Sequence, residues 1–205
     1  MSTSEKTYHH GDLRAALLDA AIQALEAGEP FSLRAVARRA GVSPAAPYRH
    51  FADREALDSA VAVAGFTDLR TDLSAALART AASSESVTDV IADLGIAYVG
   101  FAVRRPAVFR LMFGNGCDEA DSDRVKASAE LHALLSEAIE RLLPEADVPN
   151  LSTALWSLAH GLAFLHLDGK LRPESADAVA ARVRSAVAAI FAVSIRPASP
   201  VGAAS

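Results

Sequence analysis

Five arginines stand close together between residues 34 and 54, in a chain whose overall charge is negative. They are Arg34, Arg38, Arg39, Arg49 and Arg54. Only one acid, Asp53, opposes them, so this stretch carries +4 while the whole chain carries −5 at pH 7. Guanidinium groups bind phosphate oxygens, and a local excess of positive charge is the electrostatic signature of nucleic-acid binding. We therefore expect a small DNA-contacting face on an otherwise acidic protein.

The residues between these arginines predict two short helices around a tight turn, followed at once by the start of a third. Ala37, Ala40 and Gly41 are small where two helices must cross closely. Ser43 is a good N-cap, and Pro44 then falls at the first position of the second helix, where its missing N–H is not needed. A short helix, a turn containing glycine and a second short helix form a helix-turn-helix, whose second helix enters the major groove of DNA.

This segment resembles the DNA-binding domain of the tetracycline-repressor (TetR/AcrR) family of bacterial regulators. The similarity covers residues 8 to 66 and rests on FSLRAVARRAGVS (31–43), on Tyr48 and Phe51, and on DREAL (53–57). Farther along, RPAVFRLMF (105–113) and WSLAHG (156–161) resemble one branch of the family with a WHG-type C-terminal domain. The resemblance implies an all-α fold, with a three-helix DNA-binding domain and a C-terminal bundle for ligand binding and dimerisation.

The pattern of apolar residues and helix-breaking residues predicts three regions. We expect a DNA-binding domain with its N-terminal arm over 1–54, a ligand-binding and dimerisation domain over 55–197, and a disordered tail over 198–205. Helices are predicted over residues 12–27, 34–40, 54–78, 87–104, 106–114, 124–143, 150–167 and 175–194, with a further short helix that carries Tyr48.

Nine residues are the candidates for DNA contact. They are Arg34, Ser43, Pro44, Ala45, Ala46, Tyr48, Arg49, His50 and Arg54. The resemblance implies that Arg34 reaches a base edge, where its fork suits guanine O6 and N7. It also implies phosphate contacts for Tyr48, Arg54 and the region of Ser43, and the alternative interpretation of Tyr48 is a core aromatic. The segment 44–47 is apolar, so the reading of bases must rest on Arg34, Arg49 and His50.

Pro47 departs from the family pattern, in which a leucine or a similar residue is usual at this position. Proline lacks the backbone N–H, so a regular helix interior is not expected here. The departure concerns the geometry of the second helix and leaves the helix-turn-helix assignment in place.

A second group of residues predicts a pocket for a small-molecule effector. Its members are Tyr98, Phe101, Arg105, Phe109, Met112, Phe113, Trp156, His160 and Phe164. Aromatic side chains and methionine beside a short helix that begins at Pro106 are typical of a pocket lining. The same side chains can also be core, and His160 can be a hydrogen-bonded core histidine. Arg105 is read either as a partner of helix-terminal carbonyls or as a partner of an anionic ligand.

The last two predicted helices are rich in small and branched apolar residues on more than one face. Because a bundle needs one buried face, the second face predicts a homodimer. The positions proposed for this contact are Ala154, Leu158, Ala180, Val183, Val187 and Ile190. A symmetric dimer would present two helix-turn-helix units to a pseudo-palindromic operator in double-stranded DNA.

Other functions find little support in the sequence. No Ser-His-Asp, Cys-His or clustered-carboxylate set can be assembled, so no catalytic residue and no cofactor is predicted. The adjacent His9 and His10 lack further ligands at suitable spacing, and the acids from Asp118 to Asp123 lack the pattern of a calcium loop, so no metal is predicted. The single cysteine, Cys117, and the absence of a long apolar run fit a cytoplasmic protein without a membrane span.

We therefore expect a ligand-responsive transcriptional regulator, most simply a repressor that a small, mainly apolar effector releases from its operator. A helical enzyme and a DNA-binding protein without a ligand are the alternatives. The sequence does not name the effector, the operator or the regulated genes, and it leaves activation open.

Overall fold

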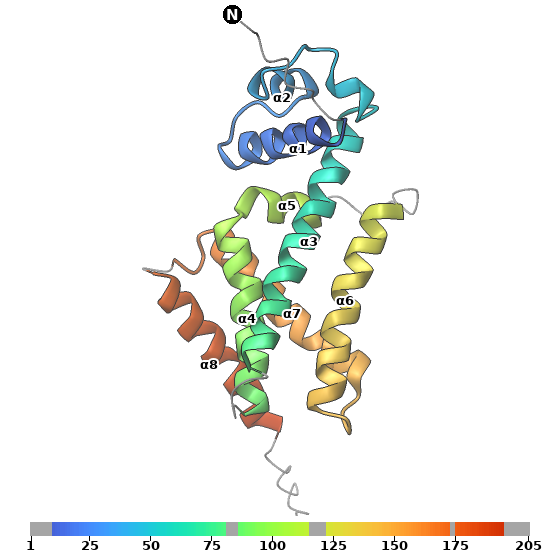
Figure 1. Cartoon of the computed structure of the whole chain (residues 1–205). Helices are drawn as coiled ribbons and strands as arrows, with labels where there is room; N and C mark the ends of the chain where they lie inside the picture. Colours follow the sequence, from blue (N-terminus) through green and yellow to red (C-terminus); the bar gives the residue numbers. More distant parts are fainter. Residues whose placement is uncertain (1–9, 81–85, 115–121, 173–174, 195–205) are drawn as a thin grey trace, which may run out of the picture. The chain divides into compact units, whose positions relative to one another are not determined.

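The computed structural model describes residues 10–80, 86–114, 122–172 and 175–194. These residues form eight α-helices and one 3-10 helix, with no strand among them, so the predicted all-α fold is confirmed. The α-helices are α1 (His10–Glu26), α2 (Leu33–Arg39), α3 (Arg54–Thr80), α4 (Val87–Arg104), α5 (Pro106–Gly114), α6 (Ser122–Leu142), α7 (Val148–Leu167) and α8 (Ala176–Ser194) (Figure 1). The 3-10 helix η1 (Pro47–Arg49) lies between α2 and α3.

The chain divides into two compact units, each built from two separate stretches. The first unit contains residues up to Asp68 and residues 105–132, and the second contains residues 69–104 and residues from Ala133 onward. Helices α3 and α6 contribute to both units. The predicted functional boundary at residue 54 does not coincide with this division by packing, and the domain ranges 1–54 and 55–197 stay a prediction. The tail 198–205, His9 and Cys117 lie outside the described residues.

The core of the first unit joins α1, α2 and the start of α3. Leu17, Val36 and Phe51 are buried there, with Ala21 and Ala37 between them. Ser32 caps the start of α2, because its Oγ accepts a hydrogen bond from the backbone N–H of Ala35 at 3.2 Å. The turn after α2 needs a positive φ, which Gly41 adopts at +70° without the steric cost that a Cβ would bring.

The second element of the expected helix-turn-helix is not an α-helix, so the helix predicted to begin at Pro44 does not form, whereas the irregularity expected at Pro47 is present. An α-helix beginning at Pro44 would need the N–H of residue 47 to donate to the carbonyl of Ser43, and Pro47 has no N–H. The Ser43 carbonyl instead accepts from Ala46 N at 3.0 Å, which closes a turn. Residues 47–49 then form η1, in which His50 N donates to the Pro47 carbonyl at 2.9 Å. Because no α-helix begins directly after Ser43, this residue is not an N-cap, and its predicted capping role is wrong.

Helix α5 is held at both ends within the first unit. At its start, the Glu26 carboxylate accepts hydrogen bonds from the backbone N–H groups of Ala107 and Val108, each at 3.2 Å. At its end, the buried Arg124 donates to the carbonyls of Leu111 and Met112, at 3.2 and 2.9 Å. The two bonds at each end satisfy backbone groups that a short helix leaves without an internal partner.

Helix α3 approaches α5 closely at Gly65. A Cβ at residue 65 would lie 2.5 Å from Met112 Sδ and 2.8 Å from Val108 Cγ1. Glycine at this position therefore lets the two helices pack without a gap, and α5 is a fixed part of the first unit.

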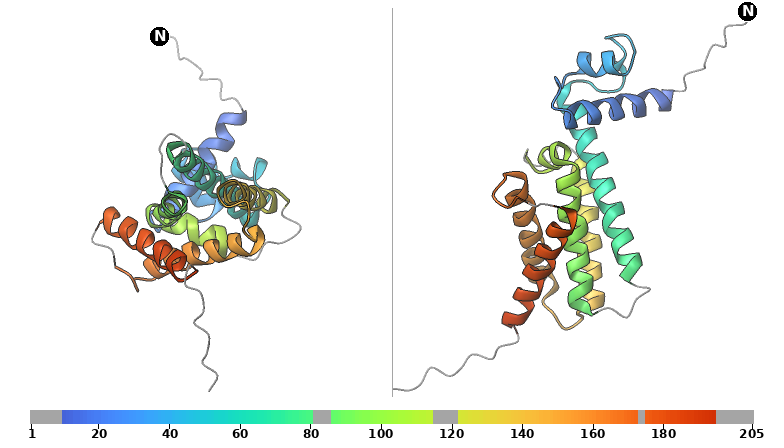
Figure 2. Two further views of the ribbon diagram at one scale, coloured as in Figure 1. Left: turned by 90° about the horizontal axis from the view of Figure 1, so that it is seen from below. Right: turned by 90° about the vertical axis from the view of Figure 1, so that its left-hand side faces the viewer.

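Helix α4 is the central element of the second unit and packs against both α7 and α8 (Figure 2). Gly95 allows the close approach of α8, because a Cβ there would lie 2.9 Å from Val183 Cγ1. Val183 and Val187 are buried in this core, together with Ile91, Val99 and others. Because these two valines pack inside the protomer, the prediction that they lie on a dimer surface is wrong. The helical period alone cannot say which apolar face of α8 is turned inward.

The remaining helix ends agree with the sequence to within a few residues. Asp53 precedes α3, and its carboxylate accepts from Ala56 N at 2.8 Å, as a capping residue does. Helix α7 begins at Val148, two residues earlier than predicted, and Asp147 caps it. No helix among the described residues is long and apolar enough to cross a membrane.

Candidate functional site

The candidate DNA-contact residues lie on α2, in the turn that follows it, on or next to η1, and at the start of α3, all within the first unit. Arg34, Arg38 and Arg49 are exposed, and none of them makes a hydrogen bond or an ion pair with the described residues. Their guanidinium groups are therefore available to outside acceptors. Ser43, Pro44 and Ala45 are exposed, while Ala46 is half-buried.

Tyr48 and His50 are placed differently, although both border η1. The Tyr48 side chain is 51% exposed, so it is not a core aromatic and can present its hydroxyl to a phosphate. The Nε2 atom of His50 is buried and has no hydrogen-bond partner among the described residues. In this conformation that nitrogen is not accessible to a base edge.

Arg39 and Arg54 already have partners within the first unit. Arg39 forms a 2.6 Å ion pair with Glu29, so its guanidinium is engaged by the protein itself. The Arg54 guanidinium lies over the Phe31 ring, 5.6 Å from its centroid, and its Nε is 3.8 Å from the Asp58 carboxylate. Because the Arg54 side chain is still 65% exposed, it can reach a phosphate as well.

Asp58, which lies beside Arg54, is a carboxylic acid whose burial disfavours its ionised form. Burial raises the pKa of its carboxyl group above 3.8, and the nearby Arg54 and Arg124 oppose that rise without cancelling it. Its Oδ1 is buried and has no hydrogen-bond partner among the described residues. The ionised form of Asp58 therefore weakens the folded state of the first unit.

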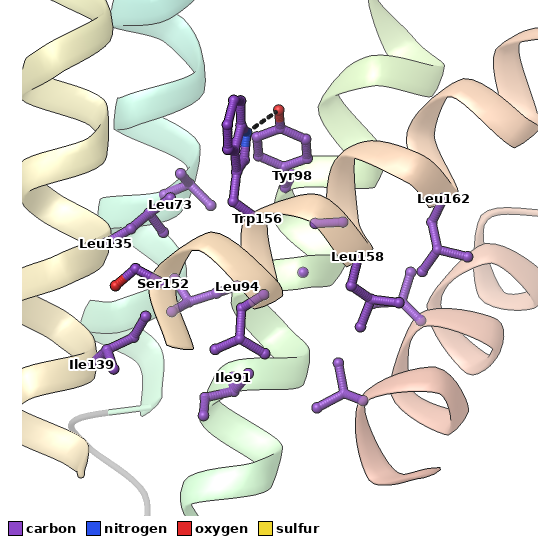
Figure 3. Close-up of a pocket in the computed structure, with 15 residues that line it drawn as sticks. Leu73, Ile91, Leu94, Tyr98, Leu135, Ile139, Ser152, Trp156, Leu158 and Leu162 are labelled. Atoms are coloured by element: carbon purple, nitrogen blue, oxygen red, sulfur yellow. Dashed lines mark hydrogen bonds between the residues drawn. The ribbon is translucent and has the colours of Figure 1, made fainter. Parts of the chain in front are cut away.

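The second unit contains a cavity of about 50 Å³ (Figure 3). Helices α3, α4, α6, α7 and α8 all contribute to its wall. Its described lining residues are Leu73, Ile91, Leu94, Gly95, Tyr98, Leu135, Ile139, Ser152, Leu155, Trp156, Leu158, Ala159, Leu162, Val183 and Val187. None of them is charged, and most are aliphatic, so the cavity suits an apolar occupant.

One side of the cavity carries a chain of three hydrogen-bonding side chains. The Trp156 Nε1–H donates to the Tyr98 hydroxyl oxygen at 3.1 Å, and that oxygen lies 2.9 Å from His160 Nδ1. Tyr98 donates to Nδ1 in the imidazole tautomer that carries its proton on Nε2. Burial lowers the pKa of His160, which favours the neutral ring. Burial also raises the pKa of Tyr98, which keeps its phenol protonated.

The predicted effector residues do not all meet at this cavity. Tyr98 and Trp156 line it, His160 contacts Tyr98, and the Phe164 ring lies 4.8 Å from the His160 ring. Phe101 is buried in the second unit but does not line the cavity. The other four candidates, Arg105, Phe109, Met112 and Phe113, belong to the first unit.

The first-unit candidates have structural partners there. Phe109 and Met112 are almost wholly buried, and the Phe113 ring packs on Phe66 with centroids 5.4 Å apart. The guanidinium of Arg105 lies 3.5 Å from Glu26 and 3.3 Å from Asp68. Arg105 is thus already neutralised by two carboxylates of its own unit.

The sequence analysis did not identify most of the residues that line the cavity, because they are aliphatic and aliphatic residues occur in every helical core. A signal did exist in their spacing. Ile91, Leu94 and Tyr98 recur every three or four residues along α4, and Ser152, Leu155 and Ala159 do so along α7. This spacing identifies the inward faces of the helices. It does not show that the packing between those faces is incomplete.

Sequence models of known families match both the N-terminal and the C-terminal part of the chain. Residues 17–61 match the sequence model of the family described as "Bacterial regulatory proteins, tetR family". Residues 91–190, which include both C-terminal motifs, match the model described as "Tetracyclin repressor-like, C-terminal domain". Among the described residues, no group of three or more His, Cys, Asp or Glu side chains could hold a metal ion.

Individual relatives extend over most of the chain. The HTH-type transcriptional regulator BetI of Brucella anthropi is 28% identical over 173 residues, which are 82% of this chain and 88% of that protein. A solved structure of a protein with unknown function from Rhodococcus sp. RHA1 is 32% identical, with a TM-score of 0.75 over 89% of this chain and 97% of that one. A putative TetR-family transcription regulator from Rhodococcus sp. shares the fold at 19% identity, with a TM-score of 0.63 over 86% and 97% of the two chains.

A helix-turn-helix unit with exposed arginines, followed by a helical bundle, defines a DNA-binding transcriptional regulator. The two family matches make the assignment specific, and the chain belongs to the tetR family of bacterial regulators. The two matched families and the curated relative BetI are described as transcriptional regulators, which confirms the prediction that the chain is not an enzyme.

Proposed function

We propose that this protein is a homodimeric repressor that a small apolar effector releases from its operator. The observation that carries the proposal is the uncharged cavity in the second unit of a chain whose first unit belongs to a DNA-binding family. A core that served only to hold the bundle together would be expected to close such a space, because interiors pack to nearly uniform density.

The first unit supplies the contact with DNA. Arg34 on α2 and Arg49 on η1 are exposed and have no partner among the described residues, and they would read bases in the major groove. Tyr48 and Arg54 would hold phosphates and position these side chains. The recognition element is a turn followed by η1, so its apolar residues Pro44 and Ala45 would meet thymine methyl groups.

The second unit supplies the response to an effector. The cavity is much smaller than the roughly 300–1,000 Å³ of ordinary ligand pockets. An occupant must therefore move the lining helices apart, and α3 and α6 carry residues of both units. An effector that binds the expanded form more tightly than the compact form would shift the protein toward the expanded form. That form would hold the two helix-turn-helix units at the wrong spacing for the operator.

The dimer would use the exposed faces of α7 and α8. Small side chains lie exposed there, at Ala154, Ser157 and Gly161 on α7, and at Ala181 and Ala188 on α8. Small residues allow two helix pairs to approach closely. A repressor of this kind acts on the chromosome, so the proposed location is the cytoplasm.

The test is a selection of binding sites from random double-stranded DNA, followed by competition with small molecules. We expect one short pseudo-palindromic site and at least one neutral apolar compound that releases it. Selection of a single half-site, or of DNA without sequence preference, would contradict the proposed dimeric repressor. A specific site that no compound releases would instead favour a DNA-binding protein without an effector.

A further inference from the structure

We propose that the cavity of the second unit accepts an uncharged, largely aliphatic molecule and rejects its ionised analogues. This inference rests on the proposed function for its biological meaning, because it names the class of the effector. Its physical basis is the chemistry of the wall. Fifteen described residues line the cavity, and none carries a charge.

An ionised ligand would find no counter-charge in this wall. Two arginines on helices of the same unit are already paired, because Arg104 forms an ion pair with Asp72 at 2.6 Å and Arg184 forms one with Asp93 at 2.8 Å. Neither arginine lines the cavity. Moving a carboxylate or an ammonium group out of water into such a site costs far more than the transfer of a neutral group of similar size.

The few polar groups in the wall are engaged with protein partners. Trp156 donates to Tyr98, and the Tyr98 hydroxyl lies within hydrogen-bond distance of His160. On the α6 side, Ser136 Oγ donates to Ser152 Oγ at 3.4 Å. A polar ligand group would have to compete with these bonds, whereas an aliphatic chain or ring gains by leaving water. The site therefore recognises shape and apolar surface.

Binding should be visible without any label. The chain has a single tryptophan, Trp156, and its indole lines the cavity. Its fluorescence responds to what fills the adjoining space, so an occupant changes the emission directly. Figure 3 shows the indole beside the Tyr98 ring, with the hydrogen bond between them drawn as a dashed line.

The experiment titrates the full-length protein at pH 7.5 with three probes that share a short alkyl chain. The probes are 1-hexanol, hexanoate and hexylammonium. We expect 1-hexanol to shift the Trp156 emission with saturation, and we expect each ion to bind at least about 100-fold more weakly. Ions that bind within tenfold of 1-hexanol would overturn the inference. Absence of any saturable change with 1-hexanol, up to its solubility limit, would overturn it too.

Two variants test whether 1-hexanol binds in the cavity. Ala159→Leu adds three carbons to the α7 wall, and Ser152→Leu fills the opposite end, so each should weaken 1-hexanol binding at least about tenfold. The control is Ala78→Leu, the same change as Ala159→Leu at an exposed position of α3 that lies outside the cavity wall. Circular dichroism shows whether each variant is folded. If 1-hexanol binding survives both folded filling variants unchanged, the site lies elsewhere and the inference fails.

A parallel measurement separates this inference from the proposed function. Operator affinity is measured with and without saturating 1-hexanol. Selective binding of 1-hexanol without loss of operator affinity would support the cavity assignment and count against the effector response. Release of the operator by hexanoate as readily as by 1-hexanol would support a response and contradict the selectivity for uncharged ligands.

Discussion

At the scale of single residues, the structure separates arginines that the sequence presents as equivalent. Arg39 forms an ion pair with Glu29, and Arg54 lies close to both Asp58 and Phe31. Arg34, Arg38 and Arg49 have no such partner among the described residues. An unpaired, exposed guanidinium reaches a phosphate or a guanine without first breaking a bond inside the protein. Specific DNA contact is therefore expected to depend most on these three.

Arg34 is the residue for which a loss of base reading is most directly testable. We predict that Arg34→Ala costs about 1–3 kcal/mol of specific binding and relaxes the preference at one base pair, because a bidentate contact with guanine is lost. A binding-site selection with the variant measures the preference. Arg79→Ala removes the same charge from an exposed position of the second unit and controls for net charge. An unchanged preference at every base pair would remove Arg34 from the base-reading residues.

Arg54 is expected to act on all DNA sequences alike. We predict that Arg54→Ala lowers the slope of log K against log salt by about 0.9, the value for one phosphate contact in double-stranded DNA. Arg54→Lys keeps the charge and should keep the slope. Titrations at several salt concentrations provide the measurement. A slope that stays the same in Arg54→Ala would mean that Arg54 serves only its contacts with Asp58 and Phe31.

Asp58 gives the first unit a pH dependence of known sign. Its folded pKa is raised above 3.8 by burial, so the folded protein binds this proton more tightly than the unfolded chain does. The stability that the proton supplies is complete below pH of about 3.8 and is lost as the pH rises through the folded pKa. We predict that Asp58→Asn, which stays neutral, is more stable than the native protein at pH 7, and that its advantage shrinks toward pH 4.

Denaturation with urea at several pH values measures this difference. Asp19→Asn removes a carboxylate from an exposed position of α1 and is the matched control. A native protein that is more stable than Asp58→Asn at pH 7 would show that the attraction of Asp58 to Arg54 and Arg124 outweighs its burial.

At the scale of helices, the sequence was informative wherever a local rule decides the structure. Ser32 and Asp53 precede their helices and cap them, because a side-chain oxygen at that position satisfies a backbone N–H that has no helical partner. Pro106 begins α5 for a related reason, since the first position of a helix does not need its N–H. These rules involve neighbours in the sequence, and so the α4 and α5 bounds were predicted residue for residue.

The sequence was less informative wherever distant residues decide. The chemistry of Pro47 indicated an irregular second helix, but the balance between a short α-helix and a turn with η1 depends on how residues 44–51 pack on α2. The candidate cavity raises the same difficulty. Phe109 and Met112 have the composition of a pocket wall, yet both are buried in the first unit, where Met112 packs against α3 at Gly65. A space left open between helices is a property of the whole bundle, and no single residue type marks it.

The start of α5 depends on a distant residue that the sequence analysis did not find. Glu26 ends α1 and bonds to the N–H groups of Ala107 and Val108, 81 and 82 positions away. We predict that Glu26→Ala costs about 1–2 kcal/mol of stability, because two backbone donors and Arg105 lose an acceptor. Glu26→Gln should cost less, since its carbonyl oxygen still accepts. Urea denaturation gives the free energies, and amide exchange at residues 107 and 108 locates the change.

The control for Glu26 is Glu29→Gln, which weakens the exposed pair with Arg39 and should cost no more than about 1 kcal/mol. Equal exchange rates at residues 107 and 108 in Glu26→Ala and in the native protein would contradict the capping role. The comparison also shows whether α1 and α5 behave as one cooperative element, as their membership of the first unit suggests.

At the scale of the whole molecule, the two units share helices α3 and α6 but have separate cores. The first core is built around α1, α2 and α5, and the second around α4 with α7 and α8. Because the cavity belongs wholly to the second unit, the effector that we propose would act first on the helices that line it. Helix α3 has residues in both units and runs from Arg54 past the cavity residue Leu73, so we propose it as the segment that carries the effect to the DNA-contact residues.

The dimer that we propose would have to form through residues of α7 and α8 that are exposed in the protomer. Val183 and Val187 are buried against α4, so a charge at either position should unfold the protomer and cannot yield folded monomers. Gly161 offers a cleaner test, because it is exposed on α7 and a Cβ there would meet no atom within 4 Å. We predict that Gly161→Arg keeps its helical content and lowers the dimer affinity at least about tenfold, because close helix packing across the interface leaves no room for the side chain. Sedimentation at several concentrations measures the mass, and Gly114→Arg, at an equally open position of α5, is the control. A Gly161→Arg protein that sediments as the same dimer would place the interface on another face.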